Sequence, residues 1–284
     1  MKICRFNDDR LGVVDGEHVI DVTGALEVIP QSGWPAPIGD TLIANLDAVC
    51  AKASALAARG QQHTLSSVVL KSPVANPNKV IGAPVNYYAH QDEAIKDEGV
   101  SFGREIKTID HYGLFLKNPV LVGAGEGVDL HFTDRRNDHE VEVSLIIGKT
   151  AKNVSYENAL DYVAAYSIGL DMTVRGTEER SLRKAIDSYS VLGPWLVTAD
   201  EIADPDNLDF SIHVGDEERQ NSNTNKLIFD CRKLIEYGSS FYTLHPGDVI
   251  MTGTPEGVGP VEPGDVMHCY CEGIGSMDVD VRAA

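Results

Sequence analysis

The sequence predicts a β-dominated α+β protein, with a larger β-rich domain behind a small N-terminal domain. Three observations favour this class. Short apolar runs punctuated by Gly and Pro recur along most of the chain, and only a few segments have helical spacing. The strands also do not alternate regularly with helices, so a doubly wound parallel sheet is not expected.

The small domain is predicted to cover residues 1–74. It begins with β-like runs separated by polar turns, at residues 2–6, 11–14 and 18–22. An Ala- and Leu-rich segment at 41–59 has the spacing of a helix and ends before Gly60. A linker rich in Pro and Asn follows at 72–77, which places the second domain at residues 75–284.

The second domain is expected to contain most of the strands. The predicted strands lie at residues 140–147, 165–174, 195–198, 210–214, 248–251 and 266–271. Helical patterns are found at 156–166 and 227–240. The stretch 97–110 is polar, contains glycine and is long for a plain connection, which is typical of a functional lid or of a disordered loop.

The composition limits the candidate partners. The 284-residue chain has 43 acidic and 24 basic side chains and a formal net charge of −19. This charge repels nucleic acid and anionic membranes, and an anionic metabolite would need local cations in its pocket. No apolar run reaches the ~18 residues of a membrane span.

The cysteines indicate a reducing environment. No Cys-x-x-Cys pair occurs among Cys4, Cys50, Cys231, Cys269 and Cys271. We expect them to be buried or half-buried free thiols, since cysteine packs as a small hydrophobe. The odd number and the absence of a signal-peptide pattern at the N-terminus predict a cytoplasmic protein.

The most specific local pattern is a strand with two glutamates. Glu140 and Glu142 are two residues apart, so they project from one face of a strand at ~7 Å spacing. Carboxylates at that spacing repel each other unless they are solvated or bridged by a cation. The strand therefore has either a charged outer face or a site for Mg²⁺, Mn²⁺ or Ca²⁺.

Asp171 is a candidate third carboxylate. It interrupts an apolar run, where a charge is costly to bury unless it is paired or binds a metal. The alternative to a metal ligand is a buried ion pair, with Arg175 as the nearest candidate partner in the sequence.

Several segments occur in an order that resembles the fumarylacetoacetate hydrolase family, from Lys79 to the C-terminus. They are Asn86-Tyr87-Tyr88-Ala89-His90-Gln91-Asp92-Glu93, Leu114-Phe115-Leu116-Lys117, the strand with Glu140 and Glu142, Leu170-Asp171-Met172-Thr173-Val174-Arg175, Leu192-Gly193-Pro194-Trp195, Arg219-Gln220, Pro246-Gly247-Asp248-Val249-Ile250 and Thr252-Gly253-Thr254-Pro255-Glu256-Gly257-Val258-Gly259. The chain resembles the smaller bacterial members, the acylpyruvate hydrolases and 2-hydroxyhepta-2,4-diene-1,7-dioate isomerases. The resemblance implies a mixed β-sandwich roll as the catalytic domain, a homodimer, and a Mg²⁺ or Mn²⁺ site, with Ca²⁺ as a further candidate.

The resemblance also implies roles for individual residues. The metal ligands would be Glu140, Glu142 and Asp171, the catalytic residues His90, Glu93 and Lys184, and the substrate-binding residues Arg175, Gln220, Gly253 and Thr254. His90 and Glu93 share a face of one helical turn, and a carboxylate beside an imidazole favours its action as a general base. Without this context, His90 and Lys184 would be surface residues, and the segment 252–255 an ordinary tight turn.

The chain departs from the family pattern at three places. Ala83-Pro84-Val85 precedes Asn86 where many members have a Gly-x-Asn-Tyr start, and Gly215-Asp216 replaces a common Asn-Gly turn. A further aspartate ligand of fumarylacetoacetase itself has no match. The substrate that names the family is therefore not implied.

The expected function is hydrolysis of a carbon–carbon bond. A small anionic 2-oxo acid, either an acylpyruvate or a diketo acid from aromatic or sugar-acid breakdown, would be cleaved through a metal-held enolate. His90 and Glu93 would activate water, and Lys184 would stabilise the oxyanion. A 2-oxo acid decarboxylase, a dienoate isomerase and a sugar-acid dehydratase use the same kind of site and stay open, as does a non-catalytic metal-binding relative.

Overall fold

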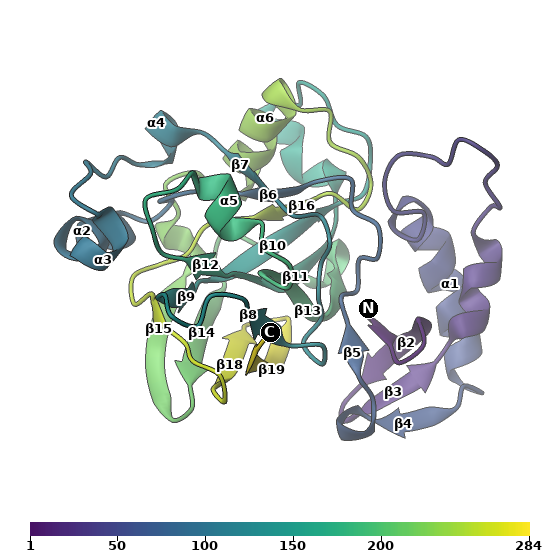
Figure 1. Ribbon diagram of the computed structural model, residues 1–284. Helices are drawn as coiled ribbons and strands as arrows, with labels where there is room; N and C mark the ends of the chain where they lie inside the picture. The colour runs from purple at the N-terminus through teal and green to yellow at the C-terminus, as the bar shows by residue number, and fades with distance from the viewer.

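The computed structural model describes residues 1–284 and has two lobes, the smaller one N-terminal (Figure 1). Its largest sheet has 11 strands, in the order β4-β3-β2-β1-β13-β11-β10-β16-β6-β7, with β5 paired to β1. These strands are β1 Lys2–Phe6, β2 Arg10–Asp15, β3 His18–Asp21, β4 Gln62–Thr64, β5 Leu70–Lys71, β6 Val80–Gly82, β7 Phe115–Lys117, β10 Val141–Ile147, β11 Val163–Asp171, β13 Ser190–Thr198 and β16 Val249–Met251.

Two smaller sheets complete the β structure. A five-stranded sheet has the order β15-β14-β18-β19-β8, and a three-stranded sheet has the order β12-β9-β17. Their strands are β8 Val128–Leu130, β9 Asn137–His139, β12 Thr173–Val174, β14 Asp209–Val214, β15 Glu217–Asn223, β17 Gly259–Pro260, β18 Val266–Cys271 and β19 Gly275–Ala283. Most pairs are antiparallel, but β16 with β6 and β19 with β8 are parallel. The predicted α+β class with mixed sheets is confirmed.

The helices are short and lie around the sheets (Figure 1). The α-helices are α1 Leu46–Ala57, α2 Tyr88–Lys96, α3 Glu98–Ser101, α4 Ile109–Tyr112, α5 Arg180–Lys184 and α6 Cys231–Phe241. The 3-10 helices are η1 Thr23–Val28, η2 Ile43–Asn45, η3 Leu65–Ser67, η4 Tyr156–Tyr162, η5 Ala199–Glu201 and η6 Thr224–Lys226. None combines the length and the apolar character that crossing a bilayer would require.

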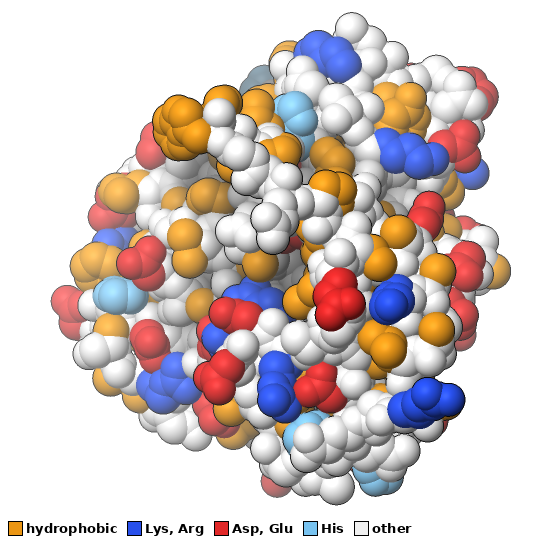
Figure 2. Space-filling view, turned by 90° about the vertical axis from the view of Figure 1, so that its right-hand side faces the viewer, with side chains coloured by type: hydrophobic (Ala, Val, Ile, Leu, Met, Phe, Trp, Pro, Cys, Tyr) orange, Lys and Arg blue, Asp and Glu red, His pale blue; other side chains and the backbone are white.

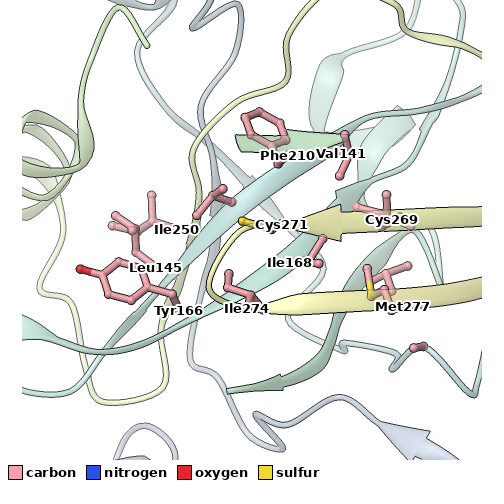
Figure 3. Close-up of a cluster of buried hydrophobic side chains, with 14 of the residues drawn as sticks. Val141, Leu145, Tyr166, Ile168, Phe210, Ile250, Cys269, Cys271, Ile274 and Met277 are labelled. Atoms are coloured by element: carbon pink, nitrogen blue, oxygen red, sulfur yellow. The ribbon is translucent and has the colours of Figure 1, made fainter. Parts of the chain in front are cut away.

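The main core lies between the large sheet and the five-stranded sheet. Figure 3 shows Val141 and Ile168 of the large sheet beside Phe210, Cys269 and Met277 of the five-stranded sheet. A second apolar cluster lies where β1 pairs with β13, and it also contains residues of α1. This pairing joins the N-terminal strands to the larger lobe, and the division at residue 74 stays a prediction. Acidic and basic side chains are interspersed on the face that the N-terminal lobe presents (Figure 2).

The predicted helix at 156–166 is wrong in its second half. Residues 156–162 form η4, but Val163 begins β11, which pairs with β10 on one side and β13 on the other. Pairing at the centre of a sheet outweighs the local helical pattern. The predicted helix at 227–240 begins only at Cys231, because the Asp230 carboxylate caps it by accepting a hydrogen bond from the Lys233 N–H at 2.7 Å.

The predicted free thiols are confirmed, since none of the five cysteines forms a disulfide and four are buried. Burial raises the pKa of Cys4 and Cys271 to about 12, so these thiols remain protonated and unreactive.

Candidate active site

The structure brings the three predicted carboxylates together at the ends of two neighbouring strands. Glu142 lies on β10, Glu140 immediately precedes it, and Asp171 is the last residue of β11. The two strands are antiparallel, and the Asp171 N–H donates to the Glu140 carbonyl at 2.9 Å. One oxygen from each carboxylate lies within 4.8 Å of the others. Every residue of β10 is buried, so a solvated charged outer face is excluded.

Lysine side chains balance part of this negative charge. The Lys184 Nζ donates to Glu140 Oε2 and Asp171 Oδ2, both at 2.7 Å, and to Thr173 Oγ1 at 2.6 Å. Buried Lys117 forms an ion pair with Asp171 and donates to the Lys184 carbonyl at 2.6 Å. Asp171 is thus paired with lysines, and the expected alternative of an ion pair with Arg175 is wrong.

Arg175 instead joins two carboxylates on the other side of the cluster. Its Nε donates to Asp138 Oδ2 at 2.8 Å and its Nη2 to Glu140 Oε1 at 2.9 Å. Burial alone would raise the pKa of Glu140, but the charges of Lys184 and Arg175 outweigh burial and lower it. Glu140 is therefore held as an anion.

Glu142 has a different environment, because no cation pairs with it directly. Its Oε2 accepts a hydrogen bond from the Gly253 N–H at 2.6 Å. Burial and then the charges of Asp171 and Glu140 raise the pKa of Glu142 well above its ordinary value. A divalent cation would relieve this repulsion, and three carboxylate oxygens are the donors that Mg²⁺ and Mn²⁺ prefer. The residues present therefore fit such an ion.

A histidine held by a carboxylate faces the same cavity. His90 lies on α2, and its Nδ1 is 3.2 Å from Glu93 Oε2. The other oxygen of Glu93 accepts a hydrogen bond from the Gly257 N–H at 2.9 Å. With Nδ1 fixed in this way, Nε2 is the nitrogen of His90 left for proton transfer.

The segment from Thr252 to Gly257 supports the cluster from one side. Gln220 is buried, and its Oε1 accepts a hydrogen bond from the Val141 N–H at 3.0 Å while its Nε2 donates to Thr254 Oγ1 at 2.8 Å. The Gly253 N–H is occupied by Glu142. Thr254 lines the cavity, whereas Gln220 and Gly253 lie behind its wall. Their predicted contacts with substrate stay predictions.

The cavity measures about 810 Å³. The predicted site residues in its wall are His90, Glu140, Glu142, Asp171, Arg175, Lys184 and Thr254. The stretch 97–110 forms another part of the wall, through residues that include Arg104 and Ile106. Its closure as a lid stays a prediction.

Sequence reasoning missed several residues of the site. Lys117 ends a segment that resembles the family, and Asp138 lies two residues before Glu140, but neither is among the predicted site residues. Both are charged residues buried within short strands, β7 and β9, where a charge needs a partner. The cavity also contains Arg104, Arg180 and Arg183. These are cations of the kind that an anionic ligand would need in a chain of net charge −19.

The sequence and the fold match one family of enzymes. The family model described as fumarylacetoacetate (FAA) hydrolase C-terminal matches residues 79–282, and the chain belongs to this family. Maleylpyruvate hydrolase of Aquipseudomonas alcaligenes is 56% identical over the full length of both chains. Oxaloacetate tautomerase fahd2, mitochondrial, of Xenopus laevis is 32% identical over 94% of this chain and 83% of its own.

Solved structures of similar proteins share the fold of this chain. Maleylpyruvate hydrolase from Sphingobium sp. SYK-6, in complex with a manganese(II) ion and pyruvate, is 37% identical with a TM-score of 0.84, and the match covers both chains fully. A 2-hydroxyhepta-2,4-diene-1,7-dioate isomerase from Mycobacterium marinum is 25% identical with a TM-score of 0.71, over 100% of this chain and 98% of that one.

Proposed function

We propose that this chain is a hydrolase that depends on Mg²⁺ or Mn²⁺ and cleaves the carbon–carbon bond of an acylpyruvate in aromatic catabolism. One observation carries the proposal: a buried cluster of three carboxylates and a histidine oriented by a carboxylate face the same cavity. The full-length relative with 56% identity is a maleylpyruvate hydrolase, and a solved relative of that name holds manganese and pyruvate.

The reaction consumes one water and gives a carboxylic acid and pyruvate. Glu140, Glu142 and Asp171 would hold the cation, which when bound supplies Lewis-acid stabilisation of negative charge on the 2-oxo oxygen. His90 Nε2 takes a proton from water, and the resulting hydroxide adds to the distal ketone carbon. The bond between that carbon and the pyruvyl methylene then breaks, and its electron pair stays with the pyruvyl fragment. The proton held on His90 is then transferred to the methylene carbon, which gives pyruvate and restores the neutral imidazole.

Glu93 and Lys184 support this sequence. Glu93 stabilises the imidazolium that forms when His90 is protonated, because its carboxylate lies 3.2 Å from Nδ1. The Lys184 ammonium lies at the cluster and stabilises the oxyanion formed at the attacked carbonyl.

The direct test is an assay of maleylpyruvate that measures pyruvate and maleate together. Both products should form in equal amounts with Mn²⁺ or Mg²⁺, stop with a chelator and resume when metal is restored. Asp171→Ala should abolish the metal-dependent rate, whereas Asp161→Ala, an exposed carboxylate on η4 beside the same strand, should not. A fully active Asp171→Ala enzyme would remove the metal assignment.

A tautomerase or isomerase is the second candidate. The Xenopus laevis relative is named an oxaloacetate tautomerase, and a base such as His90 can move a proton at carbon without breaking a carbon–carbon bond. Ultraviolet absorbance of the oxaloacetate enol would follow this activity. Pyruvate with CO₂ would indicate a decarboxylase, and loss of water from a sugar acid a dehydratase. A non-catalytic relative is less well supported, because every predicted catalytic and metal-binding side chain is present.

We also propose a cytoplasmic homodimer. Apolar side chains are exposed on α2 and α5, where Tyr88, Ile95 and Leu182 are 65%, 56% and 65% accessible, and such surfaces favour association. Five free cysteines suit a reducing compartment. Light scattering coupled to size exclusion would give the mass, and a monomer at micromolar concentration would exclude a stable dimer.

A further inference from the structure

Arg180, the first residue of α5, lines the cavity and has no polar partner in the protein. The other basic side chains of the cavity wall all donate hydrogen bonds. Lys184 and Arg175 bind the carboxylate cluster, Arg183 donates to the Glu178 carbonyl at 3.0 Å, and Arg104 donates to the Gly176 carbonyl at 3.3 Å. The guanidinium of Arg180 lies beside two aromatic rings. Its Cζ is 4.7 Å from the centre of the Tyr112 ring and 5.6 Å from that of Phe115.

This environment favours an anionic ligand. Burial lowers the pKa of Arg180, but a guanidinium stays charged in proteins. The cation is therefore partly desolvated with no hydrogen bond or ion pair to replace its water, although carboxylates such as Glu140 and Asp171 attract it at longer range. The flanking rings hold the guanidinium through cation–π contacts, which use none of its N–H donors, and the residue lines the cavity. A carboxylate matches those donors because it can accept two parallel hydrogen bonds.

The position of Arg180 relates it to the carboxylate cluster. Lys184 is four residues further along α5, so the two side chains share one face of the helix. Both cations flank the same ring, since the Lys184 Nζ is 5.5 Å from the centre of Phe115. A small molecule in the cavity could therefore contact the cluster at one end and Arg180 at the other.

We infer that Arg180 binds a second carboxylate, at the acyl end of the substrate, and that the enzyme selects dicarboxylic acylpyruvates over uncharged ones. The inference rests on the proposed function for the placement of the pyruvyl end at the cluster. Arg180 would then determine specificity without taking part in bond cleavage.

A binding experiment tests this without turnover. Two 2-oxo acids of equal chain length, 2-oxoadipate and 2-oxohexanoate, differ in the distal carboxylate and contain no bond for the hydrolase to cleave. In calorimetric titrations with Mn²⁺ present, the wild type should bind 2-oxoadipate about 10- to 100-fold more tightly, as expected for charged hydrogen bonds. Arg180→Met should remove this preference by weakening 2-oxoadipate alone, and Arg180→Lys should restore part of it.

Arg104→Met is the matched control, because it removes one positive charge from the same cavity wall. The Arg104→Met variant should keep most of the preference for 2-oxoadipate over 2-oxohexanoate. Loss of the preference in Arg104→Met but not in Arg180→Met would overturn the assignment, as would a wild type that binds both acids equally. If Arg180→Met weakens both acids equally and lowers the melting temperature, Arg180 only packs against the aromatic rings.

Turnover separates this inference from the proposed function. Arg180→Met should raise KM for maleylpyruvate about 10- to 100-fold and leave kcat/KM for acetylpyruvate, which lacks the distal carboxylate, within about twofold. If the wild type cleaves neither compound, the hydrolase proposal fails. The preference for 2-oxoadipate and its loss in Arg180→Met would still decide the role of Arg180.

Discussion

The Glu93 carboxylate accepts a hydrogen bond from the Gly257 N–H at 2.9 Å, although the two residues lie 164 positions apart in the chain. The same carboxylate contacts His90 through its other oxygen. The backbone of the segment after β16 therefore fixes the carboxylate that orients the histidine. A helix on one side of the cavity and a turn on the other must both be in place before His90 can act as a base.

Replacement of Glu93 by Gln should lower kcat about 10- to 100-fold, less than the ~100- to 10,000-fold expected for His90→Ala. The Gln side chain can still accept from Gly257, but its NH₂ group cannot accept a hydrogen bond from the imidazole or stabilise its protonated form. KM and the melting temperature should change little. Asp92→Asn, the exposed neighbour on α2, is the control, and an equal rate loss there would contradict the assigned role.

Gly257→Ala should destabilise the fold and misplace Glu93. Gly257 has a φ of +95°, and a Cβ there would lie 1.8 Å from the Arg219 carbonyl oxygen. Gly264 has a φ of +104° with nothing within 4 Å, so Gly264→Ala measures the backbone strain alone, about 1–2 kcal/mol. Urea denaturation should give a clearly larger loss for Gly257→Ala, together with a fall in kcat. Equal losses of unfolding free energy in the two variants would show that the backbone around Gly257 shifts and relieves the close contact.

The sequence was most informative where local pattern and tertiary role agree. The predicted strands at 2–6 and 266–271 coincide with β1 and β18. Most residues of β1 are buried, and the buried residues of β18 alternate along one face of the strand. Val163 begins β11 instead of extending a helix because two neighbouring strands pair with it. β15 is not among the predicted strands because its residues are all polar, so only its pairing partner identifies it as a strand. β19 is also not among them, although Met277, Val279 and Val281 alternate with charged residues at the period of a strand.

The three carboxylates that meet in the cluster could be predicted from the sequence, but the residues that pair with them could not. Period-two spacing placed Glu140 and Glu142 together, and the interruption of an apolar run singled out Asp171 as a third carboxylate. The pattern could not show that Lys184 and Lys117 would balance Asp171, because they come from elements that meet only in the fold. Arg180 gave no signal at all, since an unpaired arginine is recognised only when every neighbour is known.

Lys184→Met should separate turnover from metal binding. Loss of the ammonium removes stabilisation of the oxyanion and should lower kcat about 100- to 1,000-fold. Mn²⁺ affinity should be retained or increase, because the Lys184 Nζ lies 2.7 Å from oxygens of both Glu140 and Asp171, where it competes with a divalent cation. Calorimetric titration with Mn²⁺ and a steady-state assay check the two effects. Lys149→Met, at an exposed lysine, should change neither, and loss of Mn²⁺ binding in Lys184→Met would contradict the competition.

Metal removal should make stability depend on the ionisation of Glu142. In the metal-free protein the pKa of Glu142 is raised above its ordinary value of 4.5 by burial and by Asp171 and Glu140. The folded chain then binds this proton more tightly than the unfolded chain does. The stability contributed by Glu142 is complete below pH 4.5 and is lost as the pH rises through the folded pKa.

Glu142→Gln removes this dependence and keeps an acceptor for the Gly253 N–H. With chelator, its melting temperature should exceed that of the wild type at pH 8, and the difference should narrow towards pH 5. Glu27→Gln, at an exposed position, should follow the wild type. Saturating Mn²⁺ should reverse the order at pH 8, because binding stabilises only the protein that holds the ion. A metal-free variant less stable than the wild type at pH 8 would mean that Glu142 stabilises the fold as an anion, and that the cluster needs no cation to balance it.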